Sequence, residues 1–76
     1  MNKLRRKAIE DIQYELGGIF EQLEALRDEE QMAYDNMPEG LQESERGEKM
    51  YEAIEGLESA TQGILEICDS LNEVIN

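Results

Sequence analysis

The apolar residues of this sequence form two long stripes with helical spacing, one on either side of Pro38. The first stripe steps by three and four residues and ends with one step of seven; its members are Ile9, Ile12, Leu16, Ile19, Leu23, Leu26 and Ala33. The second stripe alternates steps of four and three; its members are Met50, Ile54, Leu57, Thr61, Ile64, Cys68, Leu71 and Ile75. A mean period of about 3.5 residues is typical of a coiled-coil seam. Two such seams around one break predict an all-α fold, an antiparallel two-helix hairpin.

Capping and breaking residues indicate where the two helices begin and end. Asn2 and Ser44 are expected N-caps, because their side chains can accept a hydrogen bond from a free backbone N–H group. Pro38 ends the first helix, since a proline disfavours the α region for the residue before it. These signals predict one domain over residues 1–76, with helices over about 3–35 and 44–75 and a turn over 36–43.

The second helix carries apolar surface beyond its seam. A further row repeats every seven residues, and its members are Ala53, Ala60, Ile67 and Val74. One partner helix cannot cover both rows, and a domain this small is marginal alone. We therefore expect a homo-oligomer, either two hairpins in a four-helix bundle or a higher assembly. The expected core and oligomer contacts are Ile9, Ile12, Leu16, Ile19, Leu23, Leu26, Ile54, Leu57, Ile64, Ile67 and Leu71.

Two charged residues, Arg5 and Glu30, fall on the continuation of the first seam. A charge in a seam is costly unless it is paired or solvated. The hairpin geometry pairs residues whose numbers sum to about 80. Glu30 is therefore expected to pair with Lys49, and Arg5 to lie near Ile75.

Three glycines interrupt the helical segments at one predicted level, Gly17 and Gly18 on the first and Gly63 on the second. Each costs roughly 0.5–1 kcal/mol relative to alanine in a helix interior. They are expected either to allow close approach of backbones, within the hairpin or between chains, or to form a notch for a ligand.

The charge is strongly acidic, with seven basic and nineteen acidic residues and a net charge of −12. Four of the basic residues lie between Lys3 and Lys7, ahead of every acidic residue. Such a surface repels nucleic acid backbones and anionic membranes, so neither duplex nucleic acid nor a membrane is an expected partner. The acidic residues either form the solvent faces of the helices or attract a basic protein surface.

Several catalytic and metal-binding patterns are absent. Residues 35–46 place a glycine where an EF-hand loop has one, but Met37 and Arg46 replace two of its oxygen ligands. Without histidine, the Glu-x-x-His ligands of di-iron bundles are missing. Cys68 lies on the second seam, where we expect it to be a small buried hydrophobe. We expect no enzymatic activity, no cofactor and no metal site.

Basic residues at the two ends of the predicted hairpin suggest an anion pocket. Guanidinium groups and free N–H groups at a helix N-terminus suit phosphates, although the same charges would equally compensate helix dipoles or form surface ion pairs. Antiparallel docking of two hairpins would bring the two ends together, with tyrosines able to stack on a base. The residues of this predicted pocket are Lys3, Arg5, Arg6, Arg46, Lys49, Tyr34 and Tyr51.

The segment from Asp35 to Glu48, DNMPEGLQESERGE, resembles a segment of small uncharacterised proteins of bacteriophages and prophages in Gram-positive hosts. The resemblance implies a viral accessory protein. Small oligomeric phage proteins often inhibit host defence, some as sponges that sequester nucleotide immune signals.

The sequence is therefore compatible with three functions. The first is a phage-encoded anti-defence sponge that captures a small anionic nucleotide in its oligomer. The second is an acidic interaction module that inhibits a basic host protein through Glu21, Glu24, Asp28, Glu52, Glu55 and Glu58. The third is a structural or assembly helix pair. Glu10 and Asp11 stand where a signal peptide would be apolar, so we expect the protein in the host cytoplasm.

Overall fold

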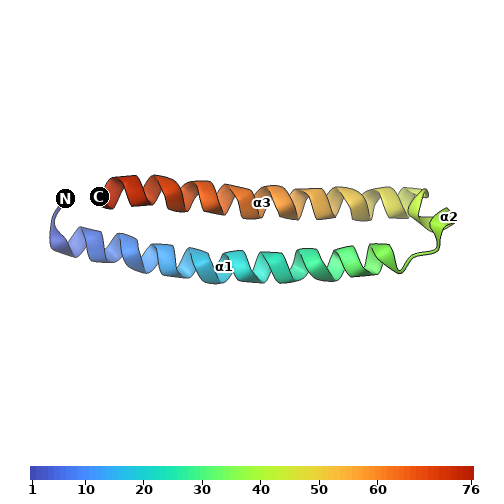
Figure 1. The fold of residues 1–76 in the computed structure, drawn as a ribbon, viewed down its shortest axis with the longest axis horizontal. Helices are drawn as coiled ribbons and strands as arrows, with labels where there is room; N and C mark the ends of the chain where they lie inside the picture. The colour runs from blue at the N-terminus through green and yellow to red at the C-terminus, as the bar shows by residue number, and fades with distance from the viewer.

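The computed structural model describes all 76 residues as two long helices packed antiparallel, which confirms the predicted hairpin (Figure 1). Helix α1 spans Lys3–Asp35, the short helix α2 spans Glu39–Gln42, and α3 spans Glu45–Ile75. The molecule measures 58 × 15 × 13 Å. Both termini lie at one end of the hairpin, and α2 lies at the other (Figure 1). No helix is long and apolar enough to cross a membrane.

Both long helices begin at the capping residues that the sequence indicates. The side chain of Asn2 accepts a hydrogen bond from the backbone N–H of Arg5 at 2.8 Å. The hydroxyl of Ser44 accepts one from the N–H of Gly47 at 3.4 Å. Each cap satisfies one of the free donors of a helix N-terminus and fixes where the helix starts.

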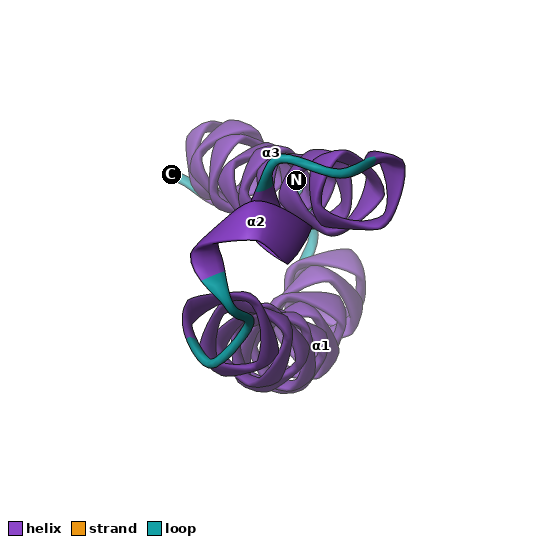
Figure 2. Ribbon diagram, turned by 90° about the vertical axis from the view of Figure 1, so that its right-hand side faces the viewer, coloured by secondary structure: helices purple, strands orange, loops and turns teal.

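Helix α2 forms a corner that connects the ends of the long helices, as the end-on view shows (Figure 2). Pro38 precedes it with an extended backbone, ψ 145°. The side-chain amide of Gln42 donates to the carbonyl oxygens of Tyr34, at 2.9 Å, and Met37, at 3.3 Å. These bonds satisfy one carbonyl in the last turn of α1 and one in the turn that follows it, and they hold α2 against the end of α1.

The seam of α3 contains the predicted residues, all of which are buried or half-buried. The predicted seam of α1 is wrong at every second position, because Ile12, Ile19 and Leu26 are 48%, 46% and 51% exposed. The helix is rotated so that the next residue along faces α3 instead. The observed inner row of α1 is Ile9, Gln13, Leu16, Phe20, Leu23, Arg27, Glu30 and Tyr34.

Two aromatic side chains favour this rotation, which also exchanges Ile12 and Leu26 for Gln13 and Arg27, whose contacts with α3 are polar. The predicted and observed rows share Ile9, Leu16 and Leu23, so the apolar spacing permits either orientation. The observed orientation half-buries the rings of Phe20 and Tyr34, and aromatic rings bury more apolar area than the isoleucine and alanine side chains that they displace. The resulting core is thin, with Ile54, at 3% exposure, as its one fully buried hydrophobic residue.

Polar contacts across the seam show its register. The side-chain amide of Gln13 donates to the side-chain oxygen of Asn72 at 2.7 Å and to the carbonyl oxygen of Cys68 at 3.4 Å. The residue numbers of the two pairs sum to 85 and 81, so the register is shifted by up to about one turn from the predicted sum of about 80. The predicted pair of Glu30 with Lys49 is wrong, because Lys49 instead lies 3.4 Å from Glu45, one turn earlier on its own helix. That partner on the same helix face needs no reach across the seam.

Candidate functional site

The hairpin is a single layer of two helices and has two broad faces. The residues that directly precede a seam residue lie on one side of each helix, and those that directly follow one lie on the other. An antiparallel pair is related by a two-fold axis perpendicular to its plane, so the preceding residues of both helices share a face. We call this the apolar face; its residues are Ile12, Ile19, Leu26, Ala33, Ala53, Ala60, Ile67 and Val74. In agreement, Glu30 lines one groove together with Leu26 and another together with Ala53.

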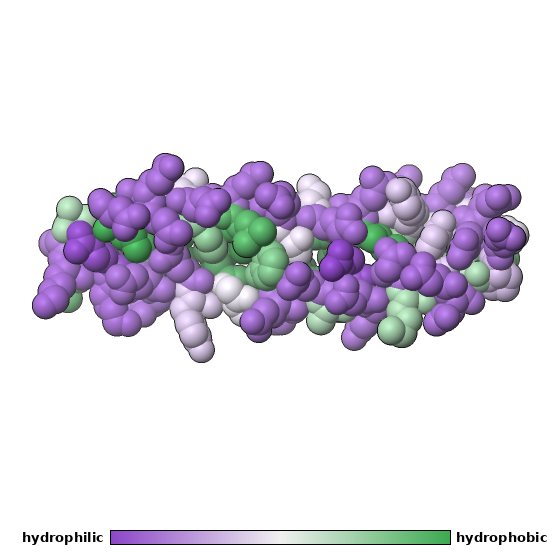
Figure 3. Space-filling view, in the orientation of Figure 1, coloured by the Kyte–Doolittle hydropathy of each residue, from purple (hydrophilic) through white to green (hydrophobic).

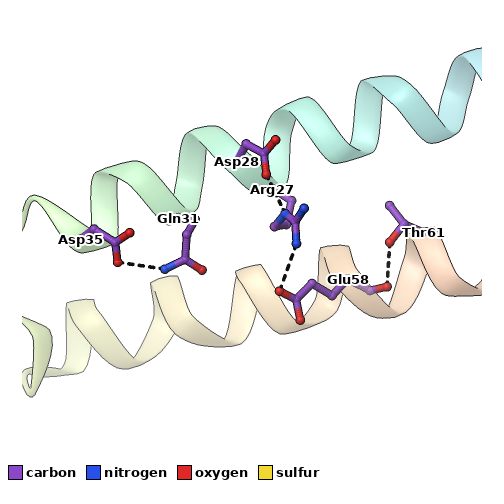
Figure 4. Close-up of polar contacts among 6 residues, drawn as sticks. All are labelled: Arg27, Asp28, Gln31, Asp35, Glu58 and Thr61. Carbon is purple, nitrogen blue, oxygen red and sulfur yellow. Dashed lines mark hydrogen bonds and ion pairs between the residues drawn. The ribbon is translucent and has the colours of Figure 1, made fainter.

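The opposite, polar face carries the side-chain contacts between α1 and α3. Arg27 is central to it: its Nε lies 2.9 Å from Asp28 and its Nη1 lies 3.3 Å from Glu58 (Figure 4). The Asp28 carboxylate, followed by the hydrogen bond to Glu58, raises the pKa of the Arg27 guanidinium. Arg27 therefore stays charged and joins the two helices on this face.

A groove near the turn on the polar face contains two of the predicted site residues. The rings of Tyr34 and Tyr51 lie 6.1 Å apart between centroids, tilted by 52°. The groove has a volume of about 430 Å³, and its other lining residues are Gln42, Gly47, Glu48, Glu52 and Glu55. We call it the tyrosine groove. It combines aromatic rings with three carboxylates and contains no basic side chain.

The basic residues of the predicted anion pocket lie elsewhere. Arg46 and Lys49 line a groove with Glu30 and Glu45, so carboxylates flank both cations. Lys3 and Arg6 line a shallow groove at the other end of the hairpin. In one chain the predicted residues therefore occupy three separate places, and the pocket between chains stays a prediction.

The N-terminal basic cluster is partly paired within its own helix. The ammonium group of Lys7 lies 2.6 Å from the Asp11 carboxylate one turn later. The hydrogen bond to Asp11, and then its charge, raise the pKa of Lys7. Arg5 contributes its backbone N–H to the Asn2 cap, and its side chain is exposed.

The predicted close-approach glycines are not required within the hairpin. A methyl group added to Gly17, Gly18 or Gly63 would meet nothing within 4 Å. Gly17 and Gly18 line an open groove with Tyr14 and Glu21. A close approach between chains stays a prediction for these positions.

Sequence reasoning missed three residues that organise the site. Gln13 and Arg27 hold the register from inside the seam, and Gly47 lies buried beneath the corner. Gln13, Phe20 and Arg27 follow one another at intervals of seven residues. This heptad spacing is the sequence signal that would have indicated a second possible seam on α1.

Comparison with protein-family models, with curated proteins and with solved structures found no match.

Proposed function

We propose that this protein is a non-enzymatic interaction module that binds a cationic surface of another protein through the tyrosine groove. The observation that carries the proposal is the lining of that groove, two tyrosine rings and three glutamates without a basic side chain. Aromatic faces attract arginine and lysine side chains, and carboxylates bind guanidinium groups through paired hydrogen bonds.

The charge distribution supports a cationic partner. Residues 20–60, which form the half of the hairpin that includes the turn, contain thirteen acidic and three basic side chains, a net charge of −10. On the face visible in Figure 3, hydrophilic side chains cover most of this half. A field of one sign steers an oppositely charged protein towards the groove and repels phosphates. The basic, DNA-binding face of a host protein has the required chemistry.

The test measures binding of a fluorescently labelled arginine–glycine peptide by anisotropy. The triple variant Glu48→Gln, Glu52→Gln and Glu55→Gln removes the carboxylates of the tyrosine groove. We expect it to weaken binding by about tenfold or more, which corresponds to about 1.4 kcal/mol. Tyr51→Ala should weaken binding as well, since Tyr51 is 53% exposed and its ring is accessible to the peptide.

A matched triple variant at the other end of α3 separates the groove from net charge. Glu66→Gln, Asp69→Asn and Glu73→Gln are also exposed and remove the same charge. We expect this control to retain most of the affinity. Equal losses in the two triple variants would mean that only net charge attracts the peptide, and the groove would not be a site.

A second candidate, capture of a small anionic nucleotide, rests on the positions of two arginines. Arg5 stands seven residues before Ile12 and Arg46 seven residues before Ala53, so both continue the rows of the apolar face at opposite ends. An antiparallel assembly of two hairpins would bring them together. Calorimetric titration with cyclic and ADP-ribose-type nucleotides tests this function. Binding that survives high salt and is lost in Arg5→Ala or Arg46→Ala would favour it over the interaction module.

A further inference from the structure

We propose that a second copy of this chain docks on the apolar face, with its turn against the open end of the first, to form an antiparallel four-helix bundle. The occupant and its direction follow from three observations: the apolar side chains of that face, the surface area of the single hairpin, and the distribution of charge along it. The proposal is independent of the binding of a cationic partner on the polar face.

The apolar face has large side chains in the open half and middle of the hairpin, and only alanines, Ala33, Ala53 and Ala60, towards the turn. Its five large members are between 46% and 51% exposed; they are Ile12, Ile19, Leu26, Ile67 and Val74. Successive members of each row are seven residues, or about two turns, apart, which is about 10 Å along a helix, so these side chains form two parallel rows on a molecule 58 Å long. Soluble monomers rarely expose an apolar surface of this extent.

The single hairpin exposes more surface than a compact monomer of its mass, and the excess is large enough for a dimer interface. The accessible surface is 5820 Å². A compact monomer of 8.7 kDa is expected to expose about 4,700 Å². The excess, about 1,100 Å², exceeds the roughly 800 Å² that one partner buries in a standard interface. A second hairpin laid along the apolar face therefore restores an ordinary ratio of surface to mass.

The charge distribution determines the direction of docking. The half that includes the turn, residues 20–60, has a net charge of −10, whereas the open half has four basic and six acidic residues and a net charge of −2. Docking with both turns at one end would place two strongly acidic halves together. Antiparallel docking instead places the basic segment Lys3–Lys7 of each copy beside the acidic turn of the other, which lowers the repulsion.

Small residues on α3 permit close docking. Ala53 and Ala60 belong to the apolar face, and Gly56 and Gly63 lie one turn after them on the adjacent row. A methyl group at either glycine meets nothing within 4 Å in the single chain. Nothing inside the hairpin requires these glycines, whereas a partner backbone can approach such a surface closely.

The first test is the mass in solution, measured by sedimentation equilibrium on the wild-type chain. We expect a dimer, twice the chain mass of 8.7 kDa. Ile67→Glu should shift the mass to that of the monomer, or to an unfolded monomer by circular dichroism. The matched control is Leu65→Glu on the same helix, because Leu65 is 45% exposed against 49% for Ile67 but lies on the polar face. It should remain dimeric.

The second test measures direction and does not depend on any disruptive variant. In a Cys68→Ser background, one spin label is placed at Glu43→Cys beside the turn and, in a separate sample, one at Gln22→Cys near the middle. Antiparallel docking predicts a distance between turn labels that approaches the 58 Å length of the molecule and a much shorter distance between middle labels. A helical wild-type monomer, a dimer retained in Ile67→Glu, or turn labels as close as the middle labels would each overturn the proposal.

Discussion

Gly47 is the residue on which the corner between α2 and α3 depends. It is one of the two fully buried residues, together with Ile54. A methyl group at this position would overlap the backbone carbonyls of Leu41 and Gln42. These are backbone atoms of α2, so the overlap cannot be relieved by rotation of a side chain.

The substitution Gly47→Ala is therefore expected to destabilise the protein by about 1–3 kcal/mol, the usual cost of overpacking. Gly18→Ala is the matched control, because it also lies in a long helix but has nothing within 4 Å. It should instead stabilise by up to about 1 kcal/mol through helix propensity. Urea denaturation followed by circular dichroism measures both. Equal, small gains in the two variants would contradict the structural role of Gly47.

At the scale of the helices, the inner row of α1 contains polar residues where apolar ones are available next to them. Ile12 and Leu26 stand directly before Gln13 and Arg27, yet the latter pair faces α3. Polar groups inside a coiled-coil seam specify register at a cost in stability. Because Gln13 and Arg27 bond to particular residues of α3, a shifted pairing of the helices loses those bonds.

Arg27→Leu tests whether Arg27 specifies the register of the helices at a cost in stability. We expect the melting temperature to rise, because an apolar side chain in the seam replaces a charged one. We also expect broader or additional amide resonances in the NMR spectrum, since the bond from Arg27 across the seam to Glu58 no longer selects one pairing. Glu58→Gln retains the size of its side chain, so it should neither raise the melting temperature nor broaden the resonances. A lower melting temperature in Arg27→Leu, with a single set of sharp resonances, would contradict the register role.

The helices and their antiparallel pairing could be predicted because they follow from spacing, caps and one proline, which act locally. The rotation of α1 could not, since Ile9, Leu16 and Leu23 belong to both possible seams and the choice depends on how Phe20 and Arg27 meet α3. The separation of Tyr51 from Lys49 follows instead from the seam of α3, because Lys49 directly precedes Met50 and Tyr51 directly follows it. Only the position of Tyr34 beside Tyr51 depends on the rotation of α1.

At the scale of the whole molecule, charge repulsion opposes the compact state. The hairpin has nineteen acidic and seven basic residues around a thin core. The ion pairs of Lys7 and Lys49 are exposed and contribute little to the stability of the fold. Repulsion between like charges reaches about 30 Å at 0.01 M salt but only about 8 Å at 0.15 M.

The melting temperature is therefore expected to rise when sodium chloride is increased from low to moderate concentration, as measured by circular dichroism. An uncharged osmolyte of matched osmolality is the control for effects of the solvent. A melting temperature that falls with salt would mean that attractive pairs such as those of Arg27 outweigh the general repulsion.

The position of both chain ends at one end of the hairpin has a mechanical consequence. A force applied between residues 1 and 76 acts first on the pair of helix ends beside them (Figure 1). The helices would then separate like a zipper, one level after another towards the turn. A pull between one terminus and the turn would instead have to slide the whole seam at once. Optical-trap measurements with the two attachment geometries should give a low, steady force for the first and a higher, abrupt rupture for the second. A cellular unfoldase that holds one end against an anchored other end would therefore meet little resistance, however stable the protein is at equilibrium.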